Sequence, residues 1–341
     1  MKKTIFAALI LSTALAHAAS VLPSSLRTDG KTVQKAFARA ADSAQQCTVR
    51  VYHGSKMVLG TVVSEDGLII CKNSEFTTGA RGSSRVIVKF THTNRPYRGK
   101  VVARDNTLDI VIVDINRKTD PGFEWGDSEG LKHGTWLVAG TSDAPPKVGV
   151  RGGVLSANTR EIKKAAGVIG VILGNGSKDI GGVQVRDLAK EGPAQEAGVK
   201  KGDVITAING KEVFETPKLM EMIREYDPGT KLKVSIKRSG KNMTFNITLG
   251  YRNIVYKDMK SRNDRMSKTV SVRRTGFKSI LQHDISLATT DMGGPLFDLE
   301  GKLVGINIAK ANRVEFFAIP ADAIQQMLKD NAKVISEARE D

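Results

Sequence analysis

The stretch Glu191–Val213, EGPAQEAGVKKGDVITAINGKEV, combines a short helix with a tight turn. Pro193 suits the first position of a helix, and Gly198 suits the left-handed residue that ends it. Asn209-Gly210 is a strong signal for a type I′ turn between two short strands. The stretch therefore predicts a small unit in which a short helix precedes a β-hairpin.

The neighbouring segments extend this unit to residues 165–250. GVIGVIL and GGVQVRDL precede the stretch, and two further strand-like segments, KLKVSIKR and NMTFNITLG, follow it. Between them, Thr216 is expected to cap a helix that begins at Pro217 and that Pro228 and Gly229 stop. The pattern predicts an α+β module with one longer helix packed on a sheet.

Short apolar segments separated by turn residues occupy residues 47–160 and are typical of an antiparallel barrel: CTVRVYH, LGTVVS, GLIICK, RVIVKF, KVVARD, DIVIVDI, TWLVAG and VRGGVLSA. A polar stretch, NTREIKK, then suggests a boundary. The pattern resumes over residues 270–335 with SVRRTGF, a strand around Ile285, RVEFFAIP and a final helix from Ala321. We therefore expect a mainly β domain interrupted by the α+β module.

The N-terminus has the features of a secretory signal peptide over residues 1–18. A basic start precedes an apolar run, Ile5–Ala16, that is too short to span a bilayer, and small residues follow. No later segment reaches the roughly 20 apolar residues of a membrane helix. The signal predicts an exported protein, in the bacterial periplasm or secreted, with an N-terminal segment over residues 19–46 that contains an alanine-rich helix from Thr32 to Gln46.

The chain is basic, with 52 lysines and arginines against 36 carboxylates and a net charge of +16, which favours anionic partners. The basic residues are spread along the sequence, with one local excess from Arg252 to Arg274, and we expect most of them to be solvated surface. Aromatic residues make up only 5%, which argues against a nucleic-acid binder that stacks bases. No zinc-ligand spacing, EF-hand or P-loop is present, so neither a metal nor a cofactor is expected.

The two cysteines leave two alternatives open. Cys47 and Cys71 form one disulfide in an oxidising compartment, or they are two buried free thiols that behave as small hydrophobic side chains. A disulfide requires their Cα atoms to lie within about 7 Å of each other.

Residues 165–250, with the stretch Glu191–Val213 as the most specific part, resemble a PDZ domain of the bacterial HtrA (Deg) family. The flanking halves resemble the trypsin-like protease domain of the same family, so the resemblance covers roughly residues 32–335. It implies a trypsin-like double β-barrel interrupted by an inserted PDZ domain, whereas the family's usual PDZ domain follows a completed protease domain. HtrA relatives commonly form trimers, which implies a homo-oligomer.

The resemblance also implies positions for the catalytic triad. RDNTLDIVIVDI matches the segment of the triad aspartate, which falls on Asp109. GLIICKNSEF matches the histidine segment, and the histidine falls on Ser74; TDMGGPL matches the nucleophile segment, and the serine falls on Met292. Thr290 replaces a glycine that helps to form the oxyanion hole. A serine hydroxyl is no general base at neutral pH and a thioether cannot attack a peptide carbonyl, so the triad is expected to be vestigial.

Replacement catalytic residues are not evident. The four histidines beyond the signal peptide fall outside the motif position for the base, and we expect them on the surface or in turns: His53, His92, His133 and His283. Cys71 lies three residues from Ser74, but a thiolate nucleophile requires a neighbouring base or cation that the sequence does not identify.

The PDZ resemblance implies a peptide groove in which loop N–H groups bind a C-terminal carboxylate and the peptide adds as a strand. The implied binding residues are Gly167, Val168, Ile169 and Gly170 in the loop, Val171, Ile172 and Leu173 in the strand, and Lys218 and Met222 on the facing helix. The alternative interpretation is that Ile169, Ile172 and Ile223 are simply core residues.

Three functions follow as hypotheses. The preferred one is an exported HtrA-like pseudoprotease that binds peptide segments, unfolded proteins or protein C-termini through its PDZ groove, with a chaperone-like or regulatory role. The second is an active HtrA-type serine endopeptidase in protein quality control. The third is a regulator that assembles with an active relative.

Overall fold

The computed structural model describes residues 23–27, 30–76, 84–91, 93, 95–143, 149–256 and 265–340. The predicted signal peptide lies outside these residues. None of the helices in the described ranges is long and apolar enough to cross a membrane.

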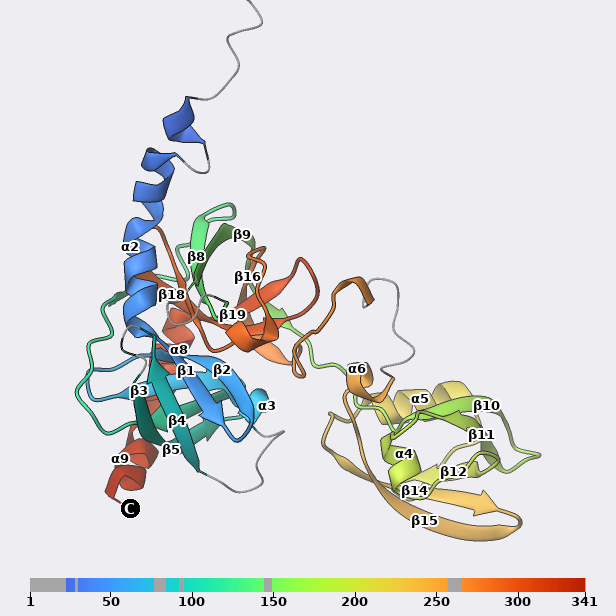
Figure 1. Cartoon of the computed structure of the whole chain (residues 1–341). Coiled ribbons are helices and arrows are strands. Elements are labelled where there is room, and N and C mark those ends of the chain that lie inside the picture. The colour runs from blue at the N-terminus through green and yellow to red at the C-terminus, as the bar shows by residue number, and fades with distance from the viewer. Residues whose placement is uncertain are drawn as a thin grey trace, which may run out of the picture.

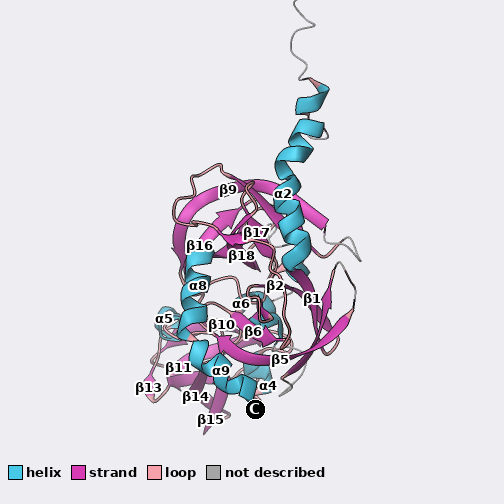
Figure 2. Ribbon diagram, turned by 90° about the vertical axis from the view of Figure 1, so that its left-hand side faces the viewer, coloured by secondary structure: helices cyan, strands magenta, loops and turns pink. Residues whose placement is uncertain are grey.

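Six antiparallel strands close the first barrel in the order β1-β2-β3-β6-β5-β4. They are β1 (Thr48–His53), β2 (Lys56–Val62), β3 (Leu68–Lys72), β4 (Arg85–Phe90), β5 (Pro96–Asp105) and β6 (Ile110–Asp114). The helix α2 (Lys31–Cys47) extends away from the two barrels at its N-terminal end (Figure 2) and packs Ala40, Ala44 and Cys47 into the barrel core. A short helix, α3 (Asn73–Phe76), follows β3 directly.

A second ring has the order β17-β8-β9-β16-β19-β18, closed by pairing between β17 and β18, with β7 (Glu124–Trp125) parallel to β18. Its strands are β8 (Trp136–Thr141), β9 (Gly149–Ile162), β16 (Phe277–His283), β17 (Pro295–Phe297), β18 (Lys302–Lys310) and β19 (Phe316–Pro320). The 3-10 helix η3 (Thr289–Asp291) and the helix α8 (Ala321–Asp330) belong to this part, whereas η1 (Ser24–Leu26) contacts α2 and α9 (Ala332–Glu340) packs against β5 of the first barrel. The fold is mainly β, a trypsin-like double barrel.

The chain between β9 and β16 forms a separate module, although these two strands pair with each other (Figure 1). Its sheet has the order β10-β11-β12-β14-β15, with β13 beside β12. The elements are β10 (Val171–Ser177), β11 (Gly182–Leu188), α4 (Pro193–Glu196), β12 (Val204–Ile208), β13 (Lys211–Glu212), α5 (Thr216–Arg224), β14 (Lys231–Arg238), β15 (Lys241–Thr248) and α6 (Arg252–Val255). The module has a hydrophobic core of its own.

The turn signals of the module are confirmed. Pro193 is the first residue of α4, and Gly198 has a φ of 95°. Asn209 and Gly210 both have positive φ, 50° and 82°, as a type I′ turn requires. The prediction for Thr216 is wrong: it is the first residue of α5, and its hydroxyl donates to the Gly174 carbonyl at 2.9 Å instead of capping the helix.

Strand limits near the module differ from the prediction. β9 runs through much of NTREIKK because Ile162 still pairs with Phe277 of β16. SVRRTGF is not a strand before Phe277, and β16 ends at His283, ahead of Ile285. The domain limits 47–160, 165–250 and 270–335 stay predictions.

The two cysteines are both free and both buried in the first-barrel core. Burial raises the pKa of each thiol well above its ordinary value. Cys71 is therefore a protonated core side chain and has no thiolate character for catalysis.

Candidate functional site

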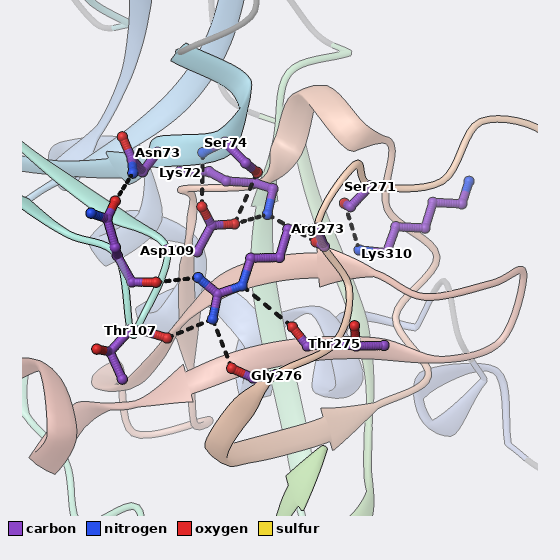
Figure 3. A network of polar contacts seen from close by, with 11 residues as sticks. Lys72, Asn73, Ser74, Thr107, Asp109, Ser271, Arg273, Thr275, Gly276 and Lys310 are labelled. Atoms are coloured by element: carbon purple, nitrogen blue, oxygen red, sulfur yellow. Dashed lines mark hydrogen bonds and ion pairs between the residues drawn. The ribbon is translucent and has the colours of Figure 1, made fainter. Parts of the chain in front are cut away.

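Ser74 and Asp109 lie together, as the triad positions should (Figure 3). Ser74 begins the turn after β3 as the second residue of α3, and Asp109 immediately precedes β6 with a φ of 61°. The carboxylate of Asp109 accepts the Ser74 N–H at 2.8 Å on Oδ1 and the Ser74 hydroxyl at 2.9 Å on Oδ2. The Ser74 hydroxyl is thus a hydrogen-bond donor to the carboxylate.

Lys72 is a third member of this site that the motif comparison missed. It is the last residue of β3, its side chain is fully buried, and its Nζ forms an ion pair with Asp109 Oδ2. A buried carboxylate without a partner would be strongly destabilising, and Lys72 supplies the compensating charge. The available signal was a lysine that closes an otherwise apolar strand segment, GLIICK.

The connector that returns from the module is tied to this site. Lys72 Nζ donates to the Arg273 carbonyl at 3.1 Å. The Arg273 guanidinium donates to the carbonyls of Asn106, Thr107 and Gly276 (Figure 3), with 2.7 Å to each of the last two. Arg273 therefore joins the turn before Asp109 to the segment that enters β16.

Met292 has its side chain in the core of the second ring. It is fully buried with leucines and isoleucines, among them Leu137, Leu281 and Ile285. Its N–H donates to the Thr289 carbonyl at 3.4 Å. The Met292 side chain is therefore part of this core, and its N–H is directed at a carbonyl of its own loop.

The turn before Met292 is stabilised by a buried carboxylate. Asp291 accepts the N–H and the hydroxyl of Ser142, both at 2.7 Å, and the Ala288 N–H at 2.7 Å. The Thr290 hydroxyl lies 3.1 Å from the Ser142 hydroxyl. These contacts hold η3 as a tight turn, and in this turn the Met292 N–H faces the Thr289 carbonyl.

Two of the histidines are core residues, so the expectation of surface or turn positions is wrong for them. His53 is buried in β1, and His283 is fully buried in β16. His283 Nδ1 accepts the Ile285 N–H at 3.2 Å, which assigns the proton to Nε2, 2.8 Å from Asn307 Oδ1. Burial lowers the pKa of His283 to about 4, so the ring is neutral at pH 7. His133 is exposed, and His92 lies outside the described residues.

The module contains a cavity of about 1060 Å³ beside β10. Most of the predicted groove residues line it: Gly167, Val168, Ile169, Val171, Ile172 and Leu173. Gly170 is buried behind them with a φ of 80°. Ile169 is both a core residue and a lining residue, so the two interpretations of this position are not exclusive.

The two helix residues predicted for the groove, Lys218 and Met222, are not among the residues that line this cavity. Met222 packs into the module core, and Lys218 is exposed beside Glu221, 2.9 Å from its carboxylate. The lining residues of α5 are Thr216, Met220, Ile223 and Arg224. They share one face because residues three or four positions apart align on a helix, whereas Lys218 and Met222 lie off that face.

Two amides of the loop have no acceptor among the residues that the structure describes. The Gly167 N–H donates to the Tyr226 carbonyl at 2.9 Å, and the Val168 N–H donates to the Gly250 carbonyl at 3.1 Å. For the N–H groups of Ile169 and Gly170, the described residues offer no acceptor within hydrogen-bond distance. Buried N–H groups are normally paired, so two adjacent unpaired donors favour an anion at this point.

The outer edge of β10 is available for a further strand. β10 pairs with β11 only, within the described sheet. One of its carbonyls, that of Val171, accepts the hydroxyl of Tyr256 at 2.9 Å. Tyr256 follows α6 and lines the same cavity, so the chain itself partly occupies the edge to which a peptide would add.

Within the described ranges, no group of three His, Cys, Asp or Glu side chains is arranged to hold a metal ion. The arrangement offers hydrogen-bond donors, an open strand edge and an apolar wall, which together suit the binding of an extended chain.

Comparisons with known proteins agree with this architecture. Residues 158–249 match the PDZ domain family. The probable periplasmic serine endoprotease DegP-like of Chlamydia trachomatis serovar D is 23% identical, over 56% of this chain and 53% of that protein. The protein of the same name from Pseudomonas putida is 21% identical, over 56% of this chain and 55% of its own length.

These matches span about half the length of the relatives. A solved HtrA-type protease with a decapeptide is 17% identical, with a TM-score of 0.30, over 63% of this chain and 97% of that chain. The PDZ domain match and the DegP-like relatives support the HtrA/Deg family as the family that this chain resembles.

Proposed function

We propose that this chain is an exported HtrA-like pseudoprotease that binds peptide segments, unfolded proteins or protein C-termini through the groove between β10 and α5. The observation that carries the proposal is the pair of unpaired N–H groups at Ile169 and Gly170 beside an open strand edge. A C-terminal carboxylate supplies the acceptors for these donors, and its chain continues as a strand along β10.

The absence of proteolysis is part of the proposal. Met292 has no nucleophilic atom for a peptide carbonyl, and its side chain is in the core. Ser74 stands where a general base is required, and its hydroxyl is donated to Asp109. Both features support binding without cleavage.

A second candidate is an endopeptidase that uses Ser74 with Lys72. The relatives are named as serine endoproteases, and the two side chains meet at the same oxygen, Asp109 Oδ2. A lysine base must offer its lone pair to the serine hydroxyl, whereas Lys72 Nζ donates to Asp109 Oδ2 and to the Arg273 carbonyl. We therefore expect no activity by this route.

Casein hydrolysis separates the two candidates. We expect no cleavage by the unmodified chain, by Ser74→Ala or by Asp109→Ala, and an authentic HtrA protease serves as the positive control. Cleavage by the unmodified chain that Ser74→Ala abolishes would establish the endopeptidase and remove the pseudoprotease proposal. The double variant Ser74→His/Met292→Ser tests in addition whether the scaffold still supports catalysis.

Peptide binding is measured by fluorescence anisotropy with one labelled peptide that ends in valine, prepared with a free and with an amidated C-terminus. We expect the free form to bind about tenfold more tightly, because a charged acceptor adds about 1.5 kcal/mol on two N–H donors. Met220→Glu places a charge in the groove and should weaken binding. Met243→Glu changes a similarly exposed methionine on β15 and should have no effect. Equal binding of both peptide forms contradicts carboxylate recognition.

Export to the periplasm and a homo-oligomeric state stay predictions. Cell fractionation tests the first, and light scattering of the mature chain tests the second. A monomer that still binds peptide would leave the groove proposal intact and remove the oligomer.

A further inference from the structure

The basic residues from Arg252 to Arg274 do not all lie on an ordinary solvated surface. Arg252, Arg265, Lys268 and Arg274 line the cavity beside β10, and Arg224 of α5 joins them. None of the lining residues, all of which the structure describes, is an aspartate or glutamate. The local charge excess in the sequence thus becomes one wall of the peptide groove.

Several of these charges have no carboxylate partner. Within the described part of the chain, no salt bridge is formed by Arg224, Arg265 or Lys268. Arg252 lies over the ring of Tyr256, with 5.4 Å from its guanidinium carbon to the ring centroid. An anion in the cavity would therefore not have to displace a carboxylate from Arg224, Arg265 or Lys268.

A further cation, Lys310, lies near Lys268 but does not line the cavity. Burial and, next, the Lys268 ammonium lower the pKa of Lys310. The backbone N–H of Lys310 donates to the Ser271 hydroxyl at 3.0 Å (Figure 3). Because neighbouring cations repel each other, the surroundings of Lys268 favour a negatively charged group.

The same cavity also has an apolar lining. Ile172 and Leu173 of β10 and Met220 and Ile223 of α5 belong to it, and Ile254 of α6 adds an exposed side chain. Val255 packs close to Gly170, so α6 and the basic residues that follow it begin next to the loop with the unpaired N–H groups. The groove therefore offers both apolar and cationic side chains beside β10.

Resting on the proposed peptide-binding function, we propose that the natural ligand is an acidic peptide. Its apolar side chains and C-terminal carboxylate bind against β10 and α5, and aspartate or glutamate side chains upstream of the terminus lie against Arg224, Arg265 and Lys268. The open strand edge and the apolar wall select a peptide over a nucleic acid, which has neither a backbone that pairs with β10 nor aliphatic side chains.

The test compares three labelled peptides that share a valine terminus with a free carboxylate and differ upstream, with two glutamates, two glutamines or two lysines. At low salt we expect the acidic peptide to bind about tenfold more tightly than the neutral one, since each exposed ion pair contributes a few-fold at most. The lysine peptide should bind least tightly. The preference should shrink at high salt, because screening weakens exposed charge pairs.

Charge-reversal variants locate the effect. Arg224→Glu/Lys268→Glu should remove the preference for the acidic peptide over the neutral one, because it replaces two of the cations that face the peptide's glutamates with like charges. Lys211→Glu changes an exposed lysine of β13 outside the cavity and should keep the preference. Circular dichroism confirms that each variant is folded.

The outcomes separate this proposal from the function on which it rests. If no peptide binds, the peptide-binding function fails. If the acidic and neutral peptides bind equally, or if the double reversal keeps the preference, the peptide groove remains and the acidic ligand is overturned. If oligothymidine displaces the acidic peptide at equal charge concentration, the cations form a general polyanion site, and the proposal is likewise overturned.

Discussion

The Ser74–Asp109 site and the groove beside β10 differ in how their polar groups are satisfied. At the first site every polar group that the family would use in catalysis is paired inside the protein: Asp109 with Lys72 and Ser74, and the Met292 amide with Thr289. At the groove, the N–H groups of Ile169 and Gly170 and three cationic side chains have no such partner among the described residues.

The difference indicates where binding energy is available. A group already paired in the free protein gains little from a ligand, because the ligand must first replace the internal partner. A donor or charge without a protein partner only exchanges water for the ligand, so it keeps the net gain of that exchange. The comparison therefore favours the module, rather than the Ser74–Asp109 site, as the functional surface, and the predictions below test it.

The largest effect is expected from Lys72→Met. The substitution leaves the Asp109 carboxylate buried without its ion pair, which should lower the free energy of unfolding by about 3–5 kcal/mol. Urea denaturation measures the change. The double variant Lys72→Met/Asp109→Asn removes both charges and should recover most of the loss. A single variant as stable as the parent would mean that the pair is not needed inside the barrel.

Met292→Ala should destabilise the protein by about 3 kcal/mol, because it leaves a cavity in the core of the second ring. Met292→Leu nearly conserves the volume and should cost less than about 1.5 kcal/mol. Thermal and urea unfolding of the two variants give the comparison. An alanine variant that unfolds like the parent would show that this position keeps the open geometry of a nucleophile loop.

Acidification should lower the free energy of unfolding and leave the peptide affinity of the groove unchanged. The pKa of His283 is about 4 in the folded protein and about 6.5 when unfolded, so the unfolded state binds more protons as pH falls through this window. The stabilising contribution is complete above pH 6.5, and about 2 kcal/mol of it is lost by pH 5. No histidine lines the groove, so peptide affinity should be flat over this range.

Urea denaturation between pH 7 and pH 5 measures this slope, and NMR titration of the imidazole signals measures the pKa directly. The variant His133→Gln changes an exposed ring and should keep the slope. A His283 ring that titrates near 6.5 would contradict the assignment of a neutral, buried imidazole.

The smallest effect is expected at the groove edge. Tyr256→Phe frees the Val171 carbonyl for a peptide N–H and should tighten peptide binding about fivefold, the worth of one net hydrogen bond. Tyr251→Phe changes a tyrosine that lines the same cavity without this bond and should leave affinity unchanged. Weaker binding in Tyr256→Phe would mean that the hydroxyl contacts the peptide instead of competing with it.

Local sequence patterns were enough for much of the fold. The turn at Asn209-Gly210 and the helix start at Pro193 depend on backbone preferences of a few adjacent residues, so they are readable without tertiary information. The motif resemblance likewise predicted that Ser74 and Asp109 lie close together, and they are hydrogen-bonded. The side of α5 that faces the groove was not predicted, because the orientation of a helix around its axis depends on the sheet beneath it. Met222, which was expected in the groove, packs into the module core together with Ile223.

The sequence by itself determined most strand segments and the separate module, since each follows from short-range pattern or motif, and it assigned the expected triad positions by resemblance. Only the tertiary structure decided that Lys72 neutralises Asp109, that Arg273 joins the connector to this site, and that the basic segment after α6 forms a wall of the groove. These contacts join residues far apart in the chain, and charge compensation depends on distance in space rather than on spacing in sequence.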